Sequence, residues 1–250
     1  KKKKSLIISK ESAVNDIRLN DAVRNHPSWA AVAMAWENAD LALSALVACM
    51  RDLSSKVERE NESVDLEASL IERATEAATK KGLQGKCTFR AVEAGPLDFP
   101  DQSFDIVTTS GAMTQISDKA GILGECFRVL KPGGSLTCYD WTKSEAPYSE
   151  DMLYWFKMEG LTYALETLEE YEIHLKNSGY VDVSIKDASS WYRAQVRREY
   201  KLIKGSLYPR MVDLLGKKDA DHFVENWRAM LVVCEKGEMR QGYCRGRRPA

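Results

Sequence analysis

Aromatic side chains are concentrated in one part of the chain, between residues 139 and 200. They are Tyr139, Trp141, Tyr148, Tyr154, Trp155, Tyr163, Tyr171, Trp191, Tyr192 and Tyr200. The face of an aromatic ring attracts a cation, by about 1–2 kcal/mol for a desolvated contact. We expect most of these rings in the hydrophobic core, but two or three of them lining a site could hold an ammonium group.

Two acidic residues stand where strands of a parallel sheet would end. Asp65 lies in the short extended stretch 63–66 and precedes a predicted helix, and Glu93 follows a predicted strand at 86–92. In a nucleoside-binding α/β sheet, an acid at the tip of the second strand accepts hydrogen bonds from both ribose hydroxyls. An Asp before a helix is also a common N-cap, so Asp65 taken alone fits either role.

The elements that would position such residues are clearest between residues 98 and 141. The pattern predicts a buried strand at 104–109, a helix at 118–130, a Lys-Pro-Gly-Gly turn at 131–134 and a second strand at 135–141. The proline stops the helix, and the glycines supply backbone conformations that other residues avoid. This is a parallel strand–helix–strand unit, and such units bind ligands at the carboxyl ends of their strands.

The rest of the chain is predicted to be mostly helical. Helices are expected at 28–60, 67–81, 149–165, 167–177, 191–203 and 210–235, and further strands at 181–185 and 239–247, the last as an edge strand. No internal repeat and no linker rich in Gly, Pro or Ser divides the chain. We therefore expect a helical N-terminal segment at 1–62 and an α/β domain at 63–250, with helical substrate-side elaborations at 149–180 and 189–236.

Composition excludes several classes of function. The 250 residues carry a formal net charge of −1, which gives no reason to expect a nucleic-acid partner. No apolar run is long enough to span a bilayer. Six scattered cysteines without a CxxC pair and three distant histidines predict neither a disulfide framework nor a metal site. These features favour the cytoplasm. Since the chain does not begin with methionine, an organelle reached after removal of a targeting peptide stays open.

The unit at 98–141, with Glu93-Ala94 before it and the Lys-Pro-Gly-Gly string inside it, closely resembles the second half of a class I S-adenosylmethionine-dependent methyltransferase. The resemblance implies a Rossmann-like α/β sheet. It also implies S-adenosylmethionine as the cofactor, S-adenosylhomocysteine as its product, and no metal. Carried over residue by residue, it places Asp65 and Leu66 at the ribose, Glu93 and Ala94 at the adenine, and Ser110 as a further cofactor contact.

From Tyr148 onward the chain resembles the phosphoethanolamine and sarcosine/dimethylglycine N-methyltransferase group. The residues that carry this likeness lie at 167–171 (TLEEY), 178–183 (SGYVDV), 187–192, 223–230 (FVENWRAM) and 237–243. The likeness implies a small-molecule amine as substrate. It implies Trp141 and Tyr163 as substrate contacts, and we add Tyr148 and Trp191 from the same aromatic group as further candidates.

Two departures from this group bear on catalysis. Residues 111–115 read Gly-Ala-Met-Thr-Gln where the group has Asp-Ala-x-x-His. Gln115 therefore takes the place of a histidine and cannot act as a general base. Leu161 stands where a phosphate-binding basic residue is expected. We name Gln115 and Tyr163 as the candidate catalytic residues, with a smaller amine than phosphoethanolamine, or a different nucleophile, left open.

The third departure concerns the cofactor. No glycine precedes Val64, so the glycine-rich loop that follows the first strand in this family is missing. Two hypotheses follow. The chain is a small-molecule N-methyltransferase, or it is a catalytically inactive paralogue that serves as a structural or interaction subunit, with its N-terminal helices available to a protein partner.

Overall fold

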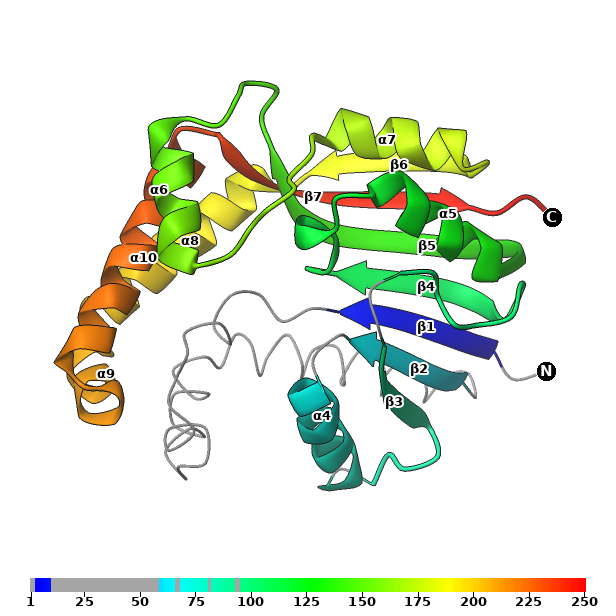
Figure 1. Cartoon of the computed structure of the whole chain (residues 1–250), viewed down its shortest axis with the longest axis horizontal. Coiled ribbons are helices and arrows are strands. Elements are labelled where there is room, and N and C mark those ends of the chain that lie inside the picture. Colours follow the sequence, from blue (N-terminus) through cyan, green and yellow to red (C-terminus); the bar gives the residue numbers. More distant parts are fainter. Residues whose placement is uncertain (1–2, 10–58, 66–67, 81, 93–94) are drawn as a thin grey trace.

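The computed structural model of the protein describes residues 3–9, 59–65, 68–80, 82–92 and 95–250 (Figure 1). Seven strands form one sheet in the order β3-β2-β1-β4-β5-β7-β6. They are β1 (Lys3–Ser9), β2 (Arg59–Asp65), β3 (Cys87–Ala91), β4 (Phe104–Ser110), β5 (Leu130–Lys143), β6 (Val181–Asp187) and β7 (Met239–Arg247). The first five are parallel, and β7 runs antiparallel to both β5 and β6. This is the predicted Rossmann-like α/β sheet.

The N-terminal residues correct one prediction. Residues 3–9 were expected within a helical segment, but they form β1, the strand between β2 and β4 at the centre of the sheet. The strand pairs along its length with both neighbours, and Leu6 is fully buried. Likewise β2 begins at Arg59, four residues before the predicted domain boundary. The helix expected at 28–60 otherwise falls outside the described residues.

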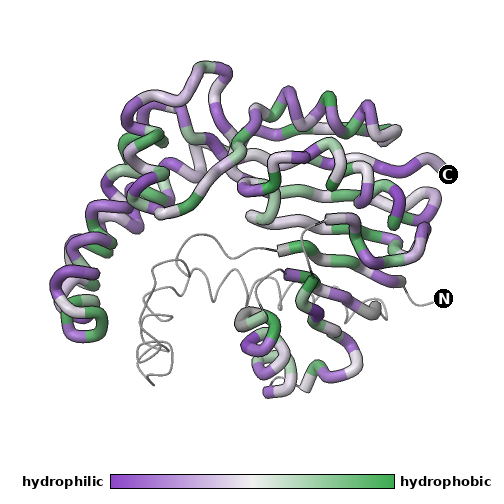
Figure 2. Tube along the Cα trace, in the orientation of Figure 1, coloured by the Kyte–Doolittle hydropathy of each residue, from purple (hydrophilic) through white to green (hydrophobic). Residues whose placement is uncertain are grey.

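The helices fall into two groups. Around the sheet lie α4 (Ala68–Lys80), α5 (Lys119–Val129) and α7 (Leu168–Asn177). The other four described helices form a helical lobe: α6 (Glu150–Glu159), α8 (Ser189–Ile203), α9 (Tyr208–Leu215) and α10 (Lys217–Glu235). The lobe lies beyond one end of the sheet, the end toward which the arrows of β1, β2 and β4 point (Figure 1). Along these helices hydrophilic and hydrophobic residues alternate, as amphipathic helices require (Figure 2).

Each group has its own hydrophobic core. The sheet core includes Leu123, Val107 and Tyr171, contributed by α5, β4 and α7. The lobe core includes Trp155 and Val233, contributed by α6 and α10. We predicted α7 as part of the substrate-side elaboration, but it packs against α5 and the last two strands of the sheet. Among the described residues, the helices of the lobe are α6 and α8–α10.

Three further predictions are corrected in detail. The Lys-Pro-Gly-Gly string is not a turn before β5. It is a bulge within β5, where four residues face Asp105 alone between the pairs Phe104–Leu130 and Ile106–Ser135. The helix expected at 210–235 is interrupted at Gly216, which has φ +81°. Strand β7 is not an edge, because β6 pairs with its outer side.

The starts of α6 and α7 follow from their capping residues. Thr167 and Glu170 form a capping box at the start of α7, with each side chain bound to the other's backbone N–H. The Ser149 hydroxyl accepts from the Met152 N–H at the start of α6. In the described part of the chain, no helix combines the length and apolar character needed to cross a membrane.

Candidate active site

The carboxyl ends of the central strands bring three polar residues to one edge of the sheet. Asp65 ends β2 directly after Val64, the partner of Ile8 in β1. On the other side of β1, Ser110 ends β4 and pairs with Ser9. Ser110 also pairs with Tyr139 of β5, so Asp140 is the next residue along the same edge. Asp65 and Ser110 therefore flank the end of β1, as the resemblance implies for cofactor contacts.

The loop after β4 is held to this edge by Asp140. Its carboxylate is 3% exposed and accepts the Met113 N–H at 2.7 Å and the Trp141 N–H at 2.8 Å. Burial raises the pKa of Asp140 to about 7, against the opposing effect of these two N–H groups and of the Lys119 ammonium. Met113 opens the 3₁₀ turn Met113–Gln115, so Asp140 fixes the segment that carries Gln115.

Lys119 joins that loop to the segment that carries Tyr163. The lysine is 1% exposed, and its ammonium donates to the carbonyls of Ile116 and Ala164. A backbone bond from Ala164 N–H to the Thr114 carbonyl at 2.8 Å runs beside it. Burial lowers the pKa of Lys119, although nearby acids oppose the effect. The two candidate catalytic residues, Gln115 and Tyr163, thus lie on segments that are fastened together.

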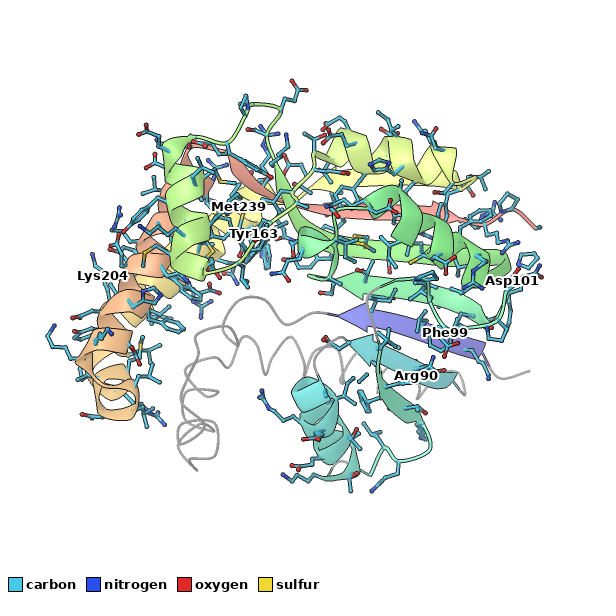
Figure 3. The ribbon with its side chains drawn as sticks, in the orientation of Figure 1. Arg90, Phe99, Asp101, Tyr163, Lys204 and Met239 are labelled. Atoms are coloured by element: carbon cyan, nitrogen blue, oxygen red, sulfur yellow. The ribbon has the colours of Figure 1, made fainter. Side chains whose placement is uncertain are left out.

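The lobe presents an aromatic cluster to the same edge of the sheet. The rings of Trp155 and Tyr163 stack with centroids 5.3 Å apart and an interplanar angle of 10°. Trp141, from the end of β5, meets them edge-on at 5.4 and 5.9 Å, and Tyr192 lies 6.4 Å from Trp141. Tyr163 is labelled in Figure 3, where the lobe joins the sheet. The cluster is a set of π faces suited to an ammonium group.

The predicted substrate contacts are only partly brought together. Trp141 and Tyr163 belong to the cluster, and Tyr148 reaches it through Phe156, whose ring lies 5.0 Å from both tyrosines. Trp191, in contrast, is 54% exposed, and its neighbour in the chain, Tyr192, contacts Trp141 instead. The cofactor candidates Leu66, Glu93 and Ala94 lie outside the described residues.

A second buried acid lies behind the aromatic cluster. Glu159, at the end of α6, is 5% exposed and accepts from Asn226 Nδ2 at 2.9 Å and from the Tyr163 hydroxyl at 3.4 Å. Burial raises the pKa of Glu159 to about 7, while Asn226, Trp155 and Tyr163 oppose this rise. Within the described ranges, no group of three or more His, Cys, Asp or Glu could hold a metal ion.

Sequence reasoning missed Asp140, Lys119, Glu159 and Asn226. Two of them left a usable signal. Asp140 directly follows the apolar alternation of a strand, and Glu159 lies four residues before Tyr163. Lys119 left none, because a lysine at a helix start normally faces solvent. Asn226 left none either, because its partner is 67 residues away in sequence.

Replacing Lys119 by methionine is expected to lower the free energy of unfolding by about 2 kcal/mol. The change removes the donor to two carbonyls and the cation near the buried Asp140 carboxyl. Denaturant titration measures the loss, with the exposed Lys157 of α6 changed to methionine as the matched control. Equal small effects of both changes would show that Lys119 does not fasten the two segments.

Comparison with known families gives a match over most of the chain. Residues 48–209, more than half of the chain, match the family described as "Methyltransferase domain". Phosphoethanolamine N-methyltransferase of Triticum aestivum is 28% identical over 181 residues, which are 72% of this chain and 34% of that protein. Phosphoethanolamine N-methyltransferase 1 of Arabidopsis thaliana is 27% identical over 179 residues, 72% of this chain and 35% of that protein. The chain spans about a third of the length of these curated relatives.

Solved structures share the fold at low identity. Haemonchus contortus phosphoethanolamine N-methyltransferase 2, in complex with phosphomonomethylethanolamine and S-adenosylhomocysteine, has a TM-score of 0.75 at 17% identity. It covers 100% of this chain and 50% of its own. The [4+2]-cyclase SpnF has a TM-score of 0.64 at 17% identity, and the match covers 100% of this chain and 75% of the SpnF chain. Because these two differ in reaction, the fold by itself does not decide the chemistry. The family match does establish kinship: this chain belongs to the methyltransferase domain family.

Proposed function

We propose that the chain is an S-adenosylmethionine-dependent methyltransferase that methylates the nitrogen of a small amine. The observation that carries the proposal is the pairing of two features at one sheet edge. These are the buried Asp65 carboxylate beside the end of β1, and the aromatic cluster that begins at Trp141. Family membership supports methyl transfer, and the phosphoethanolamine N-methyltransferase relatives support nitrogen as the acceptor.

The residues at the edge fit a nucleoside in part. Asp65 is 7% exposed at a strand tip, where a carboxylate can accept from two ribose hydroxyls, and Ser110 offers a hydroxyl on the other side of β1. When bound, S-adenosylmethionine supplies a methyl group on a positively charged sulfur. Glu93 and Ala94 remain predicted adenine contacts. The sequence between Ser9 and Arg59 contains no glycine, so other residues must hold the methionine part.

On the substrate side, the chain's own residues can orient an amine and its proton. The faces of Trp141 and Tyr163 attract the nitrogen while it is charged. The Gln115 amide oxygen can accept an N–H bond, but it cannot remove the proton, which must pass to solvent before the neutral nitrogen takes the methyl group from the sulfonium and leaves a neutral thioether. Asp140 and Lys119 act as positioning residues, because they hold the segments of Gln115 and Tyr163 in place. Such fixed placement is the main contribution a methyl transfer requires.

Changing Asp65 to alanine is expected to weaken binding of S-adenosylhomocysteine by about 2 kcal/mol, which is about 30-fold. The loss reflects two hydroxyl bonds to a charged acceptor. Calorimetric titration measures it, with Asp98→Ala as the control, because the Asp98 side chain is 92% exposed on a surface loop. An unchanged affinity for the Asp65 variant would place the nucleoside elsewhere.

Transfer of a labelled methyl group tests the activity itself. The protein is incubated with labelled S-adenosylmethionine and, separately, ethanolamine, sarcosine, dimethylglycine and phosphoethanolamine. Labelled N-methyl product from at least one amine, reduced at least tenfold in the Asp65→Ala variant, is the expected result. Cofactor binding without transfer to any amine would contradict an amine as the methyl acceptor.

A non-catalytic paralogue is the second candidate function. Two sequence features favour it: the absence of glycine between β1 and β2, and Gln115 in the place of a histidine. In that case the protein would bind neither cofactor nor amine. It would act through contacts with a protein partner, for which residues 10–58 are the candidate segment. A cytoplasmic location remains a prediction under either candidate.

A further inference from the structure

The interior of the helical lobe contains a polar group that the packing does not require. Glu159 of α6 and Asn226 of α10 face each other inside a core otherwise made of Met152, Trp155, Phe223 and similar residues. Their exposed fractions are 5% and 8%. Burying a carboxylate in such surroundings is unfavourable unless a partner compensates it.

The described residues supply no cation for Glu159. The groups that act on its carboxyl are three uncharged donors, from Asn226, Trp155 and Tyr163. Leu161, two residues beyond Glu159 in sequence, is apolar. Glu159 is therefore a buried acid with a pKa near 7 whose hydrogen-bond partners are all neutral, and a cation beside it would complete an ion pair.

Unused hydrogen-bonding atoms point to the nature of the missing group. The Asn226 amide donates through Nδ2 to Glu159, which leaves its buried Oδ1 without a donor among the described residues. The Trp155 indole N–H lies near the Glu159 carboxylate, but the two groups do not form a hydrogen bond of standard geometry. An amide oxygen and a carboxylate side by side both accept, so the complementary ligand is a donor with positive charge.

Aromatic rings surround the Glu159–Asn226 pair. Tyr163 bonds to Glu159 through its hydroxyl, and its ring stacks on Trp155 and meets the edge of Trp141. In Figure 3, Tyr163 lies at the junction of lobe and sheet, and it belongs to the same hydrophobic core as Met239 of β7. The polar pair is therefore continuous with the aromatic cluster at the carboxyl edge, where the amine is proposed to bind.

We propose that Glu159 and Asn226 form a recognition subsite for an ammonium group, and that the substrate is a small amine without phosphate. The inference rests on the proposed function and narrows its substrate class. A phosphate placed here would meet a carboxylate and an amide oxygen, so phosphoethanolamine could enter only through its ammonium end. Its phosphate would then need a partner elsewhere, and Leu161 stands where a phosphate-binding basic residue is expected, which favours an amine without phosphate.

Binding of defined probes tests the subsite without any turnover. Methylammonium, ethanolamine and phosphoethanolamine are titrated at pH 8 in the presence and absence of S-adenosylhomocysteine, with tryptophan fluorescence as the readout. Ethanolamine should bind at least tenfold more tightly than phosphoethanolamine. Glu159→Gln should weaken the binding of methylammonium at least tenfold, whereas the control Glu235→Gln, which changes an exposed acid of α10 paired with Arg197, should leave it unchanged. Tighter binding of phosphoethanolamine, or equal affinities in both variants, would overturn the subsite.

Two further readouts keep the test decisive. Methylammonium stays protonated between pH 6 and pH 8, so its affinity for the unmodified protein should rise about tenfold over this range as Glu159 ionises. This result needs no variant, and an affinity that does not change with pH would count against the subsite even if Glu159→Gln failed to fold.

The S-adenosylhomocysteine titration separates the proposed subsite from the proposed methyltransferase function. Cofactor binding without ammonium binding defeats only the subsite, and ammonium binding without cofactor binding defeats only the methyltransferase.

Discussion

Replacing Arg128 by alanine is expected to lower the free energy of unfolding by about 4 kcal/mol. The guanidinium of this α5 residue is bidentate with Glu125 at 2.8 and 2.9 Å and donates to the carbonyls of Leu97 and Phe99 at 2.8 Å. A further bond reaches Asp101 at 2.7 Å. One side chain thus holds the loop before β4, and its loss leaves the partly buried carbonyls of Leu97 and Phe99 without this donor and the Glu125 carboxylate without its cation.

Arg228 provides a matched control for this change. It forms the same bidentate pair with an acid three residues earlier, Glu225, at 2.6 and 2.7 Å. It is 45% exposed and bonds no loop carbonyl. Arg228→Ala should therefore lower the free energy of unfolding by less than about 1 kcal/mol. Chemical denaturation compares the two variants. Similar losses would mean that the ion pair, and not the loop contacts, provides the stability.

The second large effect is a pH dependence caused by Glu159. Its pKa is about 7 in the folded protein and about 4.3 in an unfolded chain, so the folded state holds its proton more tightly. The resulting stability is complete below pH 4 and is lost as the pH rises through 7. Glu159→Gln removes this loss. Relative to the unmodified protein, the variant should gain about 3 kcal/mol of unfolding free energy between pH 4 and pH 8.

Denaturant titrations at half-unit pH steps measure this relative gain. Asp140, whose pKa is also raised to about 7, weakens both proteins in the same direction, so the difference between them isolates Glu159. Glu169→Gln, which changes an exposed acid on α7, is the control and should show a nearly constant difference. A difference that does not change with pH for Glu159→Gln would show that this carboxyl is solvated or already paired with a cation.

The central part of the fold could be predicted from the sequence because its signals are local. The apolar run of β4, the helix stop at Pro132 and the capping residues Ser149 and Thr167 each act within a few residues. Strand β1 gave no such signal. Its lysines suggest a solvated tail, and what makes it a strand is pairing with β2 and β4, about 50 and 100 residues away.

The candidate site shows the same division. The positions of Asp65, Ser110 and Trp141 in the fold could be anticipated because each lies at or next to the end of a predicted strand, although β5 continues two residues past Trp141. The contacts that fasten the site could not, because Lys119 meets Ala164 and Glu159 meets Asn226 across 45 and 67 residues. Trp191 and Tyr192 are adjacent on α8, and only packing decides that Tyr192 faces the aromatic cluster.

Calorimetric titration of the unmodified protein with S-adenosylhomocysteine tests the central claim most directly. A nucleoside held by Asp65 at the tip of β2 requires saturable one-to-one binding, which we expect with a dissociation constant in the micromolar range, about −8 kcal/mol at 1 μM. Binding no tighter than about 1 mM, from a folded protein, would contradict the methyltransferase function and leave only the shared fold.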